Sequence, residues 1–353
     1  MIRRLARRWP HGRLSVSAAP VCLPAERRRD APTLPPMTLV VIVPATDSPP
    51  TLAACEAAIR TAEEPPEEVV VVEEPRGVGP AVARNLGVAR STGQIVCFVD
   101  SDVVVSADAF VRIREHFRHD PGLTAVFGAY DDELGTTGLT ARFRNLLHHH
   151  VHARSAGPAS TFWAGIGAVR RDAFEQAGGF DEIRYAKPSI EDVELGMRLV
   201  DAGARIRLDP AIRGTHLKEW TPRRMLETDF AARGVPWVHL LLDRREVPTT
   251  LNLGWRERAS ALAAVSAAAL LIRGRLRGAG VSAGLLVLLN RPFYGLLGRR
   301  LGLRSTASCV PLHIGHHLAA VAAVPVGLVT YLLGRSATTR AEADGADAGR
   351  PVA

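Results

Sequence analysis

Residues 92–102 read Thr-Gly-Gln-Ile-Val-Cys-Phe-Val-Asp-Ser-Asp. A turn at Gly93 leads into the apolar run Ile95–Val99, and two carboxylates, Asp100 and Asp102, follow the run. A short apolar run bounded by turn residues is typical of a strand buried on both faces. Carboxylates directly after such a strand lie where an open α/β sheet exposes its ligand-binding edge. The stretch therefore predicts an α/β fold with an acidic site at the end of a central strand.

Two further apolar runs precede this strand, and each is followed by a helical pattern. The runs are Leu39–Val43 and Val69–Val72, and the helical patterns are Thr51–Ala62 and Pro80–Arg90. Strands that are apolar on both faces and alternate with helices belong to a mostly parallel, Rossmann-like sheet with flanking helices.

The charge of the chain is unevenly distributed. The formal net charge is +8, and residues 1–36 hold eight arginines against Glu26 and Asp30. This segment is also rich in proline and lacks periodicity, so we expect a disordered arm, and we hypothesise that the native chain starts at Met37. The remainder is nearly neutral, which argues against nucleic acid as a partner.

The four cysteines are Cys22, Cys55, Cys97 and Cys309, and they lie far apart in the sequence. No C-x-x-C pair occurs, and no histidine stands at metal-ligand spacing from them. Cys97 lies within an apolar run and is expected to be a small core residue. This usage favours a reducing, cytoplasmic environment for the catalytic part.

The C-terminal third has a different composition. No Asp or Glu occurs between Glu257 and Glu342, although the stretch is rich in Ala, Leu and Val. Pro311–Leu333 is long enough to span a bilayer, whereas Ala259–Ile272 and Val281–Leu289 are shorter than the roughly 20 residues that a spanning helix needs.

We therefore expect a hydrophobic, helical, membrane-associated region over residues 251–335 and a disordered tail over 336–353. A buried helical subdomain is the alternative interpretation. Arginines flank every apolar segment, so the positive-inside rule decides neither the topology nor the number of crossings.

Five segments, in this order, resemble the family 2 glycosyltransferases of GT-A fold. They are Gly79–Gly87 (GPAVARNLG), Thr92–Asp102, Trp163–Phe174 (WAGIGAVRRDAF), Gly178–Glu182 (GGFDE) and Ile190–Leu199 (IEDVELGMRL). The resemblance implies a GT-A catalytic domain over residues 37–250 that uses a nucleotide-sugar donor, a divalent metal (Mg²⁺ or Mn²⁺) and an inverting mechanism.

The resemblance also implies roles for individual residues near the Asp-x-Asp pair. Asp100 and Asp102 would hold the metal and the donor, with Asp102 the more direct ligand, and His216 would complete the metal site. Arg84 would lie near the donor phosphates, and Gly165 belongs to a turn or to a loop that lets the backbone approach the donor sugar.

Donor contacts are also expected where the first two strands end. Pro44 and Asp47 follow the first strand, and Glu73 follows the second. Many family members carry an Asp-Asp-Gly-Ser-like turn after the second strand, whereas this chain has Glu73-Glu74-Pro75-Arg76. The nucleotide base of the donor therefore stays open.

The acidic pair Glu191 and Asp192 resembles the catalytic pair of the family, with Asp192 as the general base. A sugar hydroxyl is a poor nucleophile, so direct displacement needs a carboxylate that accepts its proton. Ser189-Ile190-Glu191-Asp192 also fits a capping box with Asp192 at the third helical position. Both interpretations can hold, because a first-turn carboxylate is exposed at the helix end.

Two other features are weaker candidates. His148, His149, His150 and His152 suggest a metal cluster, but neighbouring histidines on a helix point in different directions, which favours a surface or acceptor-side position. Trp220 follows His216 closely and is a candidate for the wall of the acceptor site.

The sequence thus favours an inverting, hexosyltransferase-type enzyme. It would transfer a sugar from a nucleotide sugar to a hydroxyl of a lipid-linked or cell-envelope glycan, at the cytoplasmic side of the plasma membrane. One alternative is a polyprenyl-phosphate glycosyltransferase, and another is a non-catalytic membrane scaffold with the same fold. The sugar, the acceptor and the oligomeric state stay open.

Overall fold

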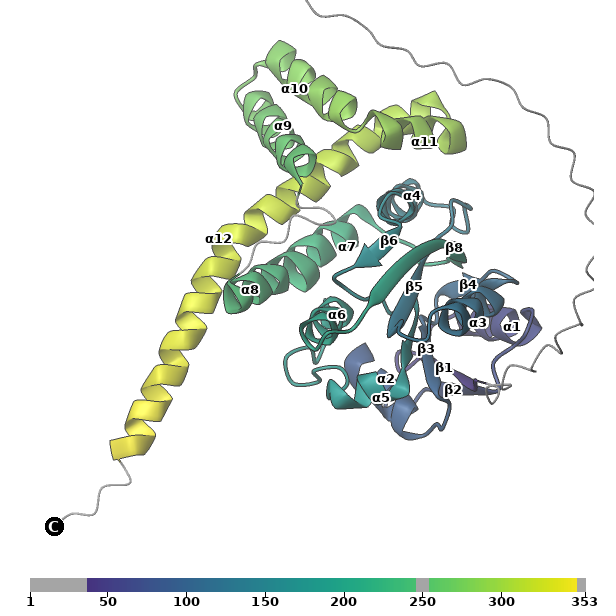
Figure 1. Ribbon diagram of the computed structural model, residues 1–353. Coiled ribbons are helices and arrows are strands. Elements are labelled where there is room, and N and C mark those ends of the chain that lie inside the picture. The colour runs from purple at the N-terminus through teal and green to yellow at the C-terminus, as the bar shows by residue number, and fades with distance from the viewer. Residues whose placement is uncertain (1–36, 246–253, 348–353) are drawn as a thin grey trace, which may run out of the picture. The chain divides into compact units, whose positions relative to one another are not determined.

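The computed structural model describes residues 37–245 and 254–347, and of 335–347 the backbone alone (Figure 1). The predicted disorder of residues 1–36 and the predicted start at Met37 concern a segment outside the described residues. The predicted boundary between residues 250 and 251 also falls outside them.

The strands of the described part form one eight-stranded mixed sheet. They are β1 (Leu39–Pro44), β2 (Glu68–Val72), β3 (Ile95–Val99), β4 (Val103–Val105), β5 (Ala125–Tyr130), β6 (Gly157–Ala159), β7 (Ile166–Arg170) and β8 (Ile206–His216). Their order is β2-β1-β3-β7-β5-β8-β4, with β6 paired to β8. Strands β1, β2, β3, β5 and β8 run in one direction, which confirms the predicted, mostly parallel α/β class.

Helices flank the sheet, and the helices predicted at Thr51–Ala62 and Pro80–Arg90 form close to their expected bounds. The flanking helices are α1 (Leu52–Thr61), α2 (Pro80–Ala89), α3 (Ala109–His119), α4 (Leu139–Ala153), α5 (Arg171–Gln176), α6 (Glu191–Asp201), α7 (Pro222–Glu227), the π-helical η1 (Thr228–Gly234) and α8 (Val235–Arg244). Short connections lead from strand to helix in the first half, as the turn residues of the sequence require.

The central strands are buried on both faces because alternate residues enter two separate cores. Val41 and Cys97 belong to the core with α1 and α3, whereas Val40 and Phe98 belong to the core with α2 and α6. Cys97 is fully buried, as expected of a small core residue. Phe98 meets the ring of Phe180 edge to face at 5.1 Å between centroids, a geometry that aromatic pairs prefer.

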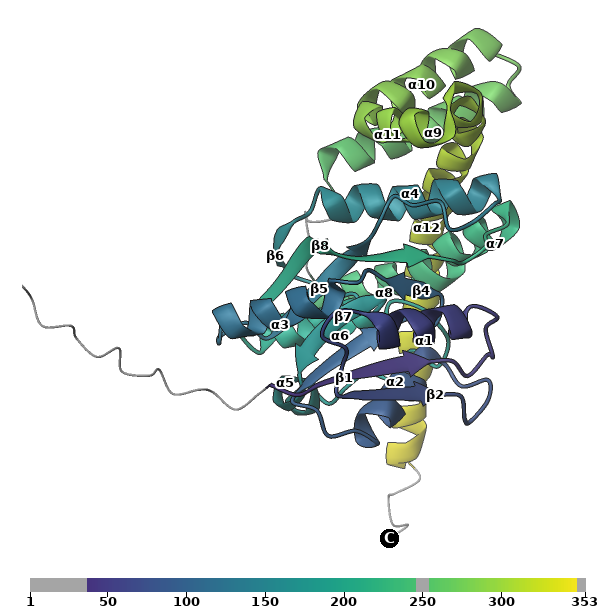
Figure 2. The ribbon, with the colours of Figure 1, turned by 90° about the vertical axis from the view of Figure 1, so that its right-hand side faces the viewer.

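The C-terminal region is helical. It consists of α9 (Trp255–Ile272), α10 (Leu276–Leu289), α11 (Arg291–Leu301) and α12 (Leu303–Asp347). Figure 2 shows α9, α10 and α11 grouped beyond α4, away from β1 and β2. The link is apolar, since Phe293 of α11 and Phe143 of α4 lie 5.7 Å apart between ring centroids.

The helix α12 extends into the segment 336–353 that was predicted to be a disordered tail. The helix α12 continues to Asp347, and residues 348–353 lie outside the described part. The sequence over this stretch is rich in alanine and includes Arg340 and Glu342, which are good helix formers.

One helix of the described residues is long and apolar enough to cross a membrane. It is the Leu303–Gly334 part of α12, with a mean hydropathy of 1.8, and only 11% of its most apolar window is buried. The pair α10 and α11 would pass the same test together, but it bends by 87° at its break.

A buried ion pair joins α4 to η1 and α12. Arg144 Nη2 lies 2.5 Å from Asp229 Oδ1, and both side chains are almost fully buried. His316 Nδ1 of α12 lies 2.8 Å from Asp229 Oδ2. Burial raises the pKa of Asp229, but the charge of Arg144 and the hydrogen bond from His316 outweigh burial and lower that pKa to about 2.

We expect Asp229→Ala to lower the free energy of unfolding by about 3–5 kcal/mol, because it leaves the Arg144 guanidinium buried without its carboxylate. Urea unfolding of the full chain measures the loss. The double variant Arg144→Met with Asp229→Leu should recover most of it.

The exposed pair Arg60–Glu56 provides a matched control, since its nitrogen and oxygen also lie close together, at 2.6 Å. Glu56→Ala should cost about 0–1 kcal/mol. Equal losses in Asp229→Ala and Glu56→Ala would contradict the structural role of the buried pair.

Candidate active site

Asp100 and Asp102 lie where β3 ends, as predicted. The Asp100 N–H donates to the carbonyl of Gly165 at 3.1 Å, and the Val103 N–H donates to the carbonyl of Asp100 at 2.9 Å, so a tight turn separates β3 from β4. Both carboxylates are only partly buried, with side-chain exposures of 30% and 17%. They are therefore accessible to a ligand at this edge of the sheet.

Antiparallel pairing of β4 with the end of β8 brings His216 to Asp102. The register sets Val103 opposite His216, and His216 Nε2 lies 3.5 Å from Asp102 Oδ1. Lys218 Nζ lies 3.5 Å from the other carboxylate oxygen. Burial raises the pKa of Asp102, but hydrogen bonds and charge from His216 and Lys218 outweigh it and hold that pKa well below its usual range.

The tautomer of His216 follows from its partner on the other side. His216 Nδ1 lies 2.7 Å from Asn145 Oδ1, and Asn145 Nδ2 donates to the His216 carbonyl at 3.0 Å, which fixes the amide orientation. The Asn145 oxygen can only accept, so Nδ1 carries the hydrogen. In the neutral ring, Nε2 then presents a lone pair to a carboxylate oxygen, and a cation between them would satisfy both.

Asp100 does not join that pair. Its Oδ1 accepts from Arg84 Nη2 at 2.7 Å, and Arg84 Nη1 donates to Glu191 Oε1 at 2.8 Å. Within residues 37–245 and 254–347, no group of three or more His, Cys, Asp and Glu side chains is placed to hold a metal ion. The structure thus brings Asp102 and His216 together but turns Asp100 to Arg84.

The side chain of Arg84, which was expected near the donor phosphates, is buried. It is 5% exposed, and it bridges the end of β3 to the start of α6. Burial, to which the charge of Asp102 adds, raises the pKa of Asp100 despite this ion pair. The guanidinium therefore aligns two carboxylates, and its position near the donor phosphates stays a prediction.

The predicted capping box at the start of α6 is wrong in detail. The helix begins at Glu191, so Asp192 is its second residue and Ile190 occupies the cap position without a side-chain hydrogen bond. Glu191 takes over the reciprocal contact, because its Oε2 accepts from the Ser189 N–H at 2.9 Å. The Ser189 hydroxyl instead donates to the carbonyl of Ala232 at 2.7 Å.

Asp192 differs from Glu191 in its partners. Its Oδ2 accepts from the Ala164 N–H at 3.0 Å and its Oδ1 from the Val193 N–H at 2.8 Å, both backbone groups. Burial and the neighbouring charge of Glu191 raise the pKa of Asp192 to about 6. Because Ala164 and Gly165 are consecutive, one short turn holds both Asp192 and Asp100 by backbone hydrogen bonds.

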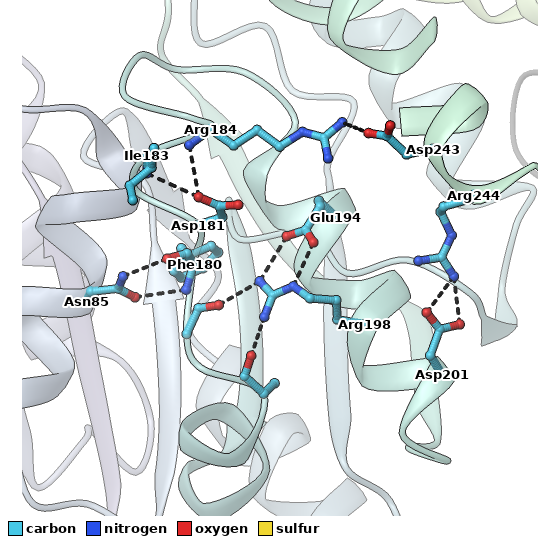
Figure 3. Close-up of polar contacts among 12 residues, drawn as sticks. Asn85, Phe180, Asp181, Ile183, Arg184, Glu194, Arg198, Asp201, Asp243 and Arg244 are labelled. Carbon is cyan, nitrogen blue, oxygen red and sulfur yellow. Dashed lines mark hydrogen bonds and ion pairs between the residues drawn. The ribbon is translucent and has the colours of Figure 1, made fainter. Parts of the chain in front are cut away.

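The helix α6 is fixed on two sides. A Cβ at Gly196 would lie 2.0 Å from the backbone nitrogen of Phe162, so glycine allows the helix to approach the turn that holds Asp192. Figure 3 shows Arg198 bound to Glu194 and to backbone carbonyls of the preceding loop. The side-chain amide of Asn85 of α2 makes two hydrogen bonds with the backbone of Phe180 in the same loop. Its nitrogen donates to the Phe180 carbonyl, and its oxygen accepts from the Phe180 N–H.

An aromatic stack lines the site next to His216. Tyr130 stacks on His216 at 4.1 Å and on His148 at 5.8 Å between ring centroids, and Trp163 meets Tyr130 edge to face at 4.7 Å. His149 Nδ1 lies 2.8 Å from the Tyr130 carbonyl oxygen. His148 and His149 therefore support the site wall, whereas His150 faces Phe293 of α11. The described residues show no metal cluster among the histidines of α4.

The remaining predicted residues lie around this centre. Asp47 and Glu73 are exposed at the ends of the adjacent strands β1 and β2, and Pro44 is the last residue of β1. A Cβ at Gly165 would lie 2.2 Å from the Trp163 ring, so Gly165 serves the packing of that indole.

Trp220 is buried against Arg144 and Lys218, with 7% exposure, and its place in the acceptor wall stays a prediction. Sequence reasoning missed Lys218, Asn145 and Tyr130. The sequence does single out Lys218, because it is one of only two lysines among 44 basic residues.

The fold and its site define a class of protein: an α/β domain with a mostly parallel sheet and an acidic centre at the open edge of that sheet. Residues 40–178 match the model of the glycosyl transferase family 2. This match agrees with the resemblance to family 2 glycosyltransferases that the sequence motifs indicated.

Curated relatives match part of the chain. The chain is 30% identical over 172 residues to the pre-mycofactocin glycosyltransferase of Mycobacterium tuberculosis, which covers 46% of this chain and 36% of that protein. It is 28% identical over 130 residues to the succinoglycan biosynthesis protein ExoM of Rhizobium meliloti, covering 37% of this chain and 42% of that one. The matched region thus spans less than half the length of these relatives.

Among solved structures, the mannosyltransferase PcManGT from Pyrobaculum calidifontis, in complex with GDP-Man and Mn²⁺, superposes with a TM-score of 0.47. The sequences are 14% identical, and the superposition covers 81% of this chain and 86% of that one.

We expect Gly196→Ala to destabilise the domain by about 1–3 kcal/mol, because the new methyl group forces α6 away from Phe162. Thermal unfolding measures the effect. Gly284→Ala in α10 is the matched control, since nothing lies within 4 Å of its Cβ position. Helix propensity alone would stabilise both variants, by about 0.5–1 kcal/mol. A stabilised Gly196→Ala would show that α6 does not depend on this close approach.

Proposed function

We propose that this chain transfers a sugar from a nucleotide-sugar donor to a hydroxyl of a lipid-linked or cell-envelope glycan acceptor, with inversion at the anomeric carbon. The proposal assigns the catalytic domain to residues 37–250 and a membrane-associated region to 251–335. The family match and the acidic centre support the reaction class, and the apolar C-terminal helices support an acceptor at the membrane.

The observation that carries the proposal is the environment of Asp192. It is a half-buried carboxylate whose hydrogen-bond donors are the backbone N–H groups of Ala164 and Val193. Its neighbour Glu191 is instead neutralised by Arg84. A raised pKa of about 6 leaves Asp192 ionised at neutral pH and makes it a stronger base than an ordinary carboxylate.

The reaction proceeds as one displacement. The acceptor hydroxyl gives its proton to an Asp192 oxygen as its own oxygen bonds to the anomeric carbon. The bond from that carbon to the diphosphate oxygen breaks on the opposite face, and its electron pair leaves with the nucleoside diphosphate. A single displacement from the opposite face inverts the anomeric configuration.

The leaving diphosphate needs positive charge, and the site offers two sources. Lys218 Nζ stands beside Asp102 and can turn to a phosphate oxygen. The oxygen and nitrogen ligands of Asp102 and His216 suit Mg²⁺ or Mn²⁺, and Asp100 could join them if it left Arg84. When bound, the metal would neutralise the diphosphate of the donor.

The donor pocket is expected beside this centre, at the ends of β1 and β2. Pro44, Asp47 and Glu73 lie there, and Gly165 lies on the side of Asp192. Two exposed carboxylates can accept hydrogen bonds from a ribose or a base. We propose that the domain works at the cytoplasmic side of the plasma membrane, in keeping with the free, buried Cys55, Cys97 and Cys309.

We expect Asp192→Asn to lower the transfer rate by about 10²–10⁴-fold and to leave donor binding intact, because the amide keeps the shape but accepts no proton. Transfer is measured with a panel of nucleotide sugars, with and without Mn²⁺. Donor binding is measured as a ligand-dependent rise in the unfolding temperature of the same variant. Asp201→Asn at the other end of α6 is the matched control and should retain full activity.

The alternatives give different results in this experiment. Full activity of Asp192→Asn on a polyprenyl phosphate would favour a polyprenyl-phosphate glycosyltransferase, whose acceptor is already an anion. If the unaltered chain bound no nucleotide sugar with or without metal, a non-catalytic scaffold would replace the proposal.

We expect kcat/KM to fall tenfold per pH unit below about pH 6, because protonation of Asp192 removes the base. Above that pH the group is ionised and the rate should level off. The groups that set this pKa are Glu191, Arg84 and Asp100 together with the Ala164 N–H. A pH profile of initial rates measures this fall in kcat/KM. If the residual activity of Asp192→Asn falls in the same way, the titrating group is not Asp192.

A further inference from the structure

Most of the large apolar side chains that the described residues expose lie on the C-terminal helices. We call this set the apolar face: Leu262, Leu271 and Ile272 of α9, Leu276, Val281, Leu285 and Leu288 of α10, and Leu303, Val321, Val324, Val326, Leu328, Val329 and Leu333 of α12. An exposed apolar surface of this extent marks a partner or a membrane.

The helix α12 has two different sides. One side contacts the catalytic domain, where Ala323 meets Gly234, Gly327 meets Val238, and the Thr330 hydroxyl lies 2.9 Å from His239 Nε2. The other side carries Val321 and Leu328, which belong to the apolar face and lie roughly opposite Ala323 on a helix with 3.6 residues per turn.

The contacts with the catalytic domain continue along the apolar stretch of α12. They begin near Gly315, where a Cβ would lie 3.1 Å from Leu226 of α7, and His316 contacts Asp229 of η1 one residue later. They extend to Thr330, about 22 Å further along the helix axis. Over most of the thickness of a bilayer core, α12 therefore has a polar domain beside it.

The helix α8, which borders α12, carries charges bound to the catalytic domain. Arg244 of α8 pairs with Asp201 of α6 at 2.6 Å, and Asp243 of α8 pairs with Arg184 at 2.7 Å (Figure 3). If α12 crossed a bilayer in this arrangement, these exposed ion pairs would enter hydrocarbon, where charged groups are costly. Keeping them in water requires α12 to lie along the membrane surface.

We propose that α12 does not cross the membrane, and that the apolar face binds in the plane of one leaflet of an anionic lipid bilayer. The contacts of α12 with α7, η1 and α8 keep the catalytic domain on the water side. Figure 1 shows α9 and α10 on the side of α12 away from the sheet.

The charges around the apolar face fit an anionic surface. Arg273, Arg275 and Arg277 connect α9 to α10, and Arg299 and Arg304 flank the junction of α11 and α12. Arg300, at the same junction, is instead paired with Asp132 and Glu133 of the catalytic domain. No acidic residue occurs in the sequence between Glu257 and Glu342. Long arginine side chains at the edge of an apolar face can reach phosphate groups while their stems stay in the interface.

The hairpin of α9 and α10 is too short to provide crossings of its own. The 14 residues of α10 span about 21 Å, against a hydrocarbon core of about 30 Å. Arg273, Arg275 and Arg277 lie where the two helices join, so a vertical hairpin would carry three charges into the bilayer.

The first test is flotation of the full chain with preformed vesicles of neutral phosphatidylcholine or of phosphatidylcholine with 30% phosphatidylglycerol. We expect at least tenfold tighter binding to the anionic vesicles. Val324→Glu with Leu328→Glu should lose at least tenfold of that binding, and Arg273→Gln with Arg275→Gln and Arg277→Gln should reduce the preference for anionic lipid. Binding to neither vesicle would overturn the proposal.

Ile183→Glu is the matched control, because Ile183 is also an exposed apolar residue but lies on the catalytic domain. Its binding should equal that of the unaltered chain. Unfolding temperatures of all variants show that the changes act on binding and not on folding. Equal loss in Ile183→Glu and in the α12 variant would overturn the assignment of the apolar face.

The second test shows whether α12 lies in the plane of the leaflet or crosses the bilayer. The full chain with a protease-cleavable tag at its C-terminus is added to preformed vesicles that enclose a reporter protein. A helix in the plane leaves the tag outside, so added protease should remove it while the reporter stays intact. A tag protected until detergent is added would show that α12 crosses. Both tests detect lipid binding alone, so their failure is distinct from a failure of the proposed sugar transfer.

Discussion

The buried guanidinium of Arg84 connects the two halves of the site. It extends from α2 between the end of β3 and the start of α6, where Asp100 and Glu191 accept its hydrogen bonds. A buried arginine needs such partners, and each carboxylate in turn needs a cation. Asp102 and Asp192 add further negative charge, which the ion pair of Lys218 and the contact of His216 with Asp102 oppose only in part. The centre is left with an excess of negative charge, which favours a bound cation.

Glu191 and Asp192 are adjacent but have different properties, because they are the first two residues of α6 and point in different directions. Glu191 points to Arg84 and the Ser189 N–H and is held as an ion pair. Asp192, about 100° further around the helix, meets the Ala164 N–H instead and has a raised pKa. Proximity in the sequence therefore does not make the two residues interchangeable, and the charge of Glu191 helps to raise the pKa of its neighbour.

The sequence predicted the first β-α units and the position of the acidic residues well, because runs such as Leu39–Val43 and Ile95–Val99 are apolar on both faces and have few alternative structures. It could not predict which carboxylate Arg84 would bind, since that depends on the meeting of α2 and α6, 107 residues apart at this contact. The stack of Tyr130 on His216 also depends on strand pairing.

The catalytic domain and the C-terminal helices are physically continuous through α8. Leu240 of α8 packs with Ile190 and Met197 in one small core at α6, and the opposite side of α8 meets α12. Because packed cores deform little, the position of α12 constrains that of α6 and hence of Asp192. A chain that binds a leaflet through α12 would therefore hold its acidic centre at a fixed distance and orientation above the lipid. Such an arrangement suits an acceptor that is itself anchored in the membrane.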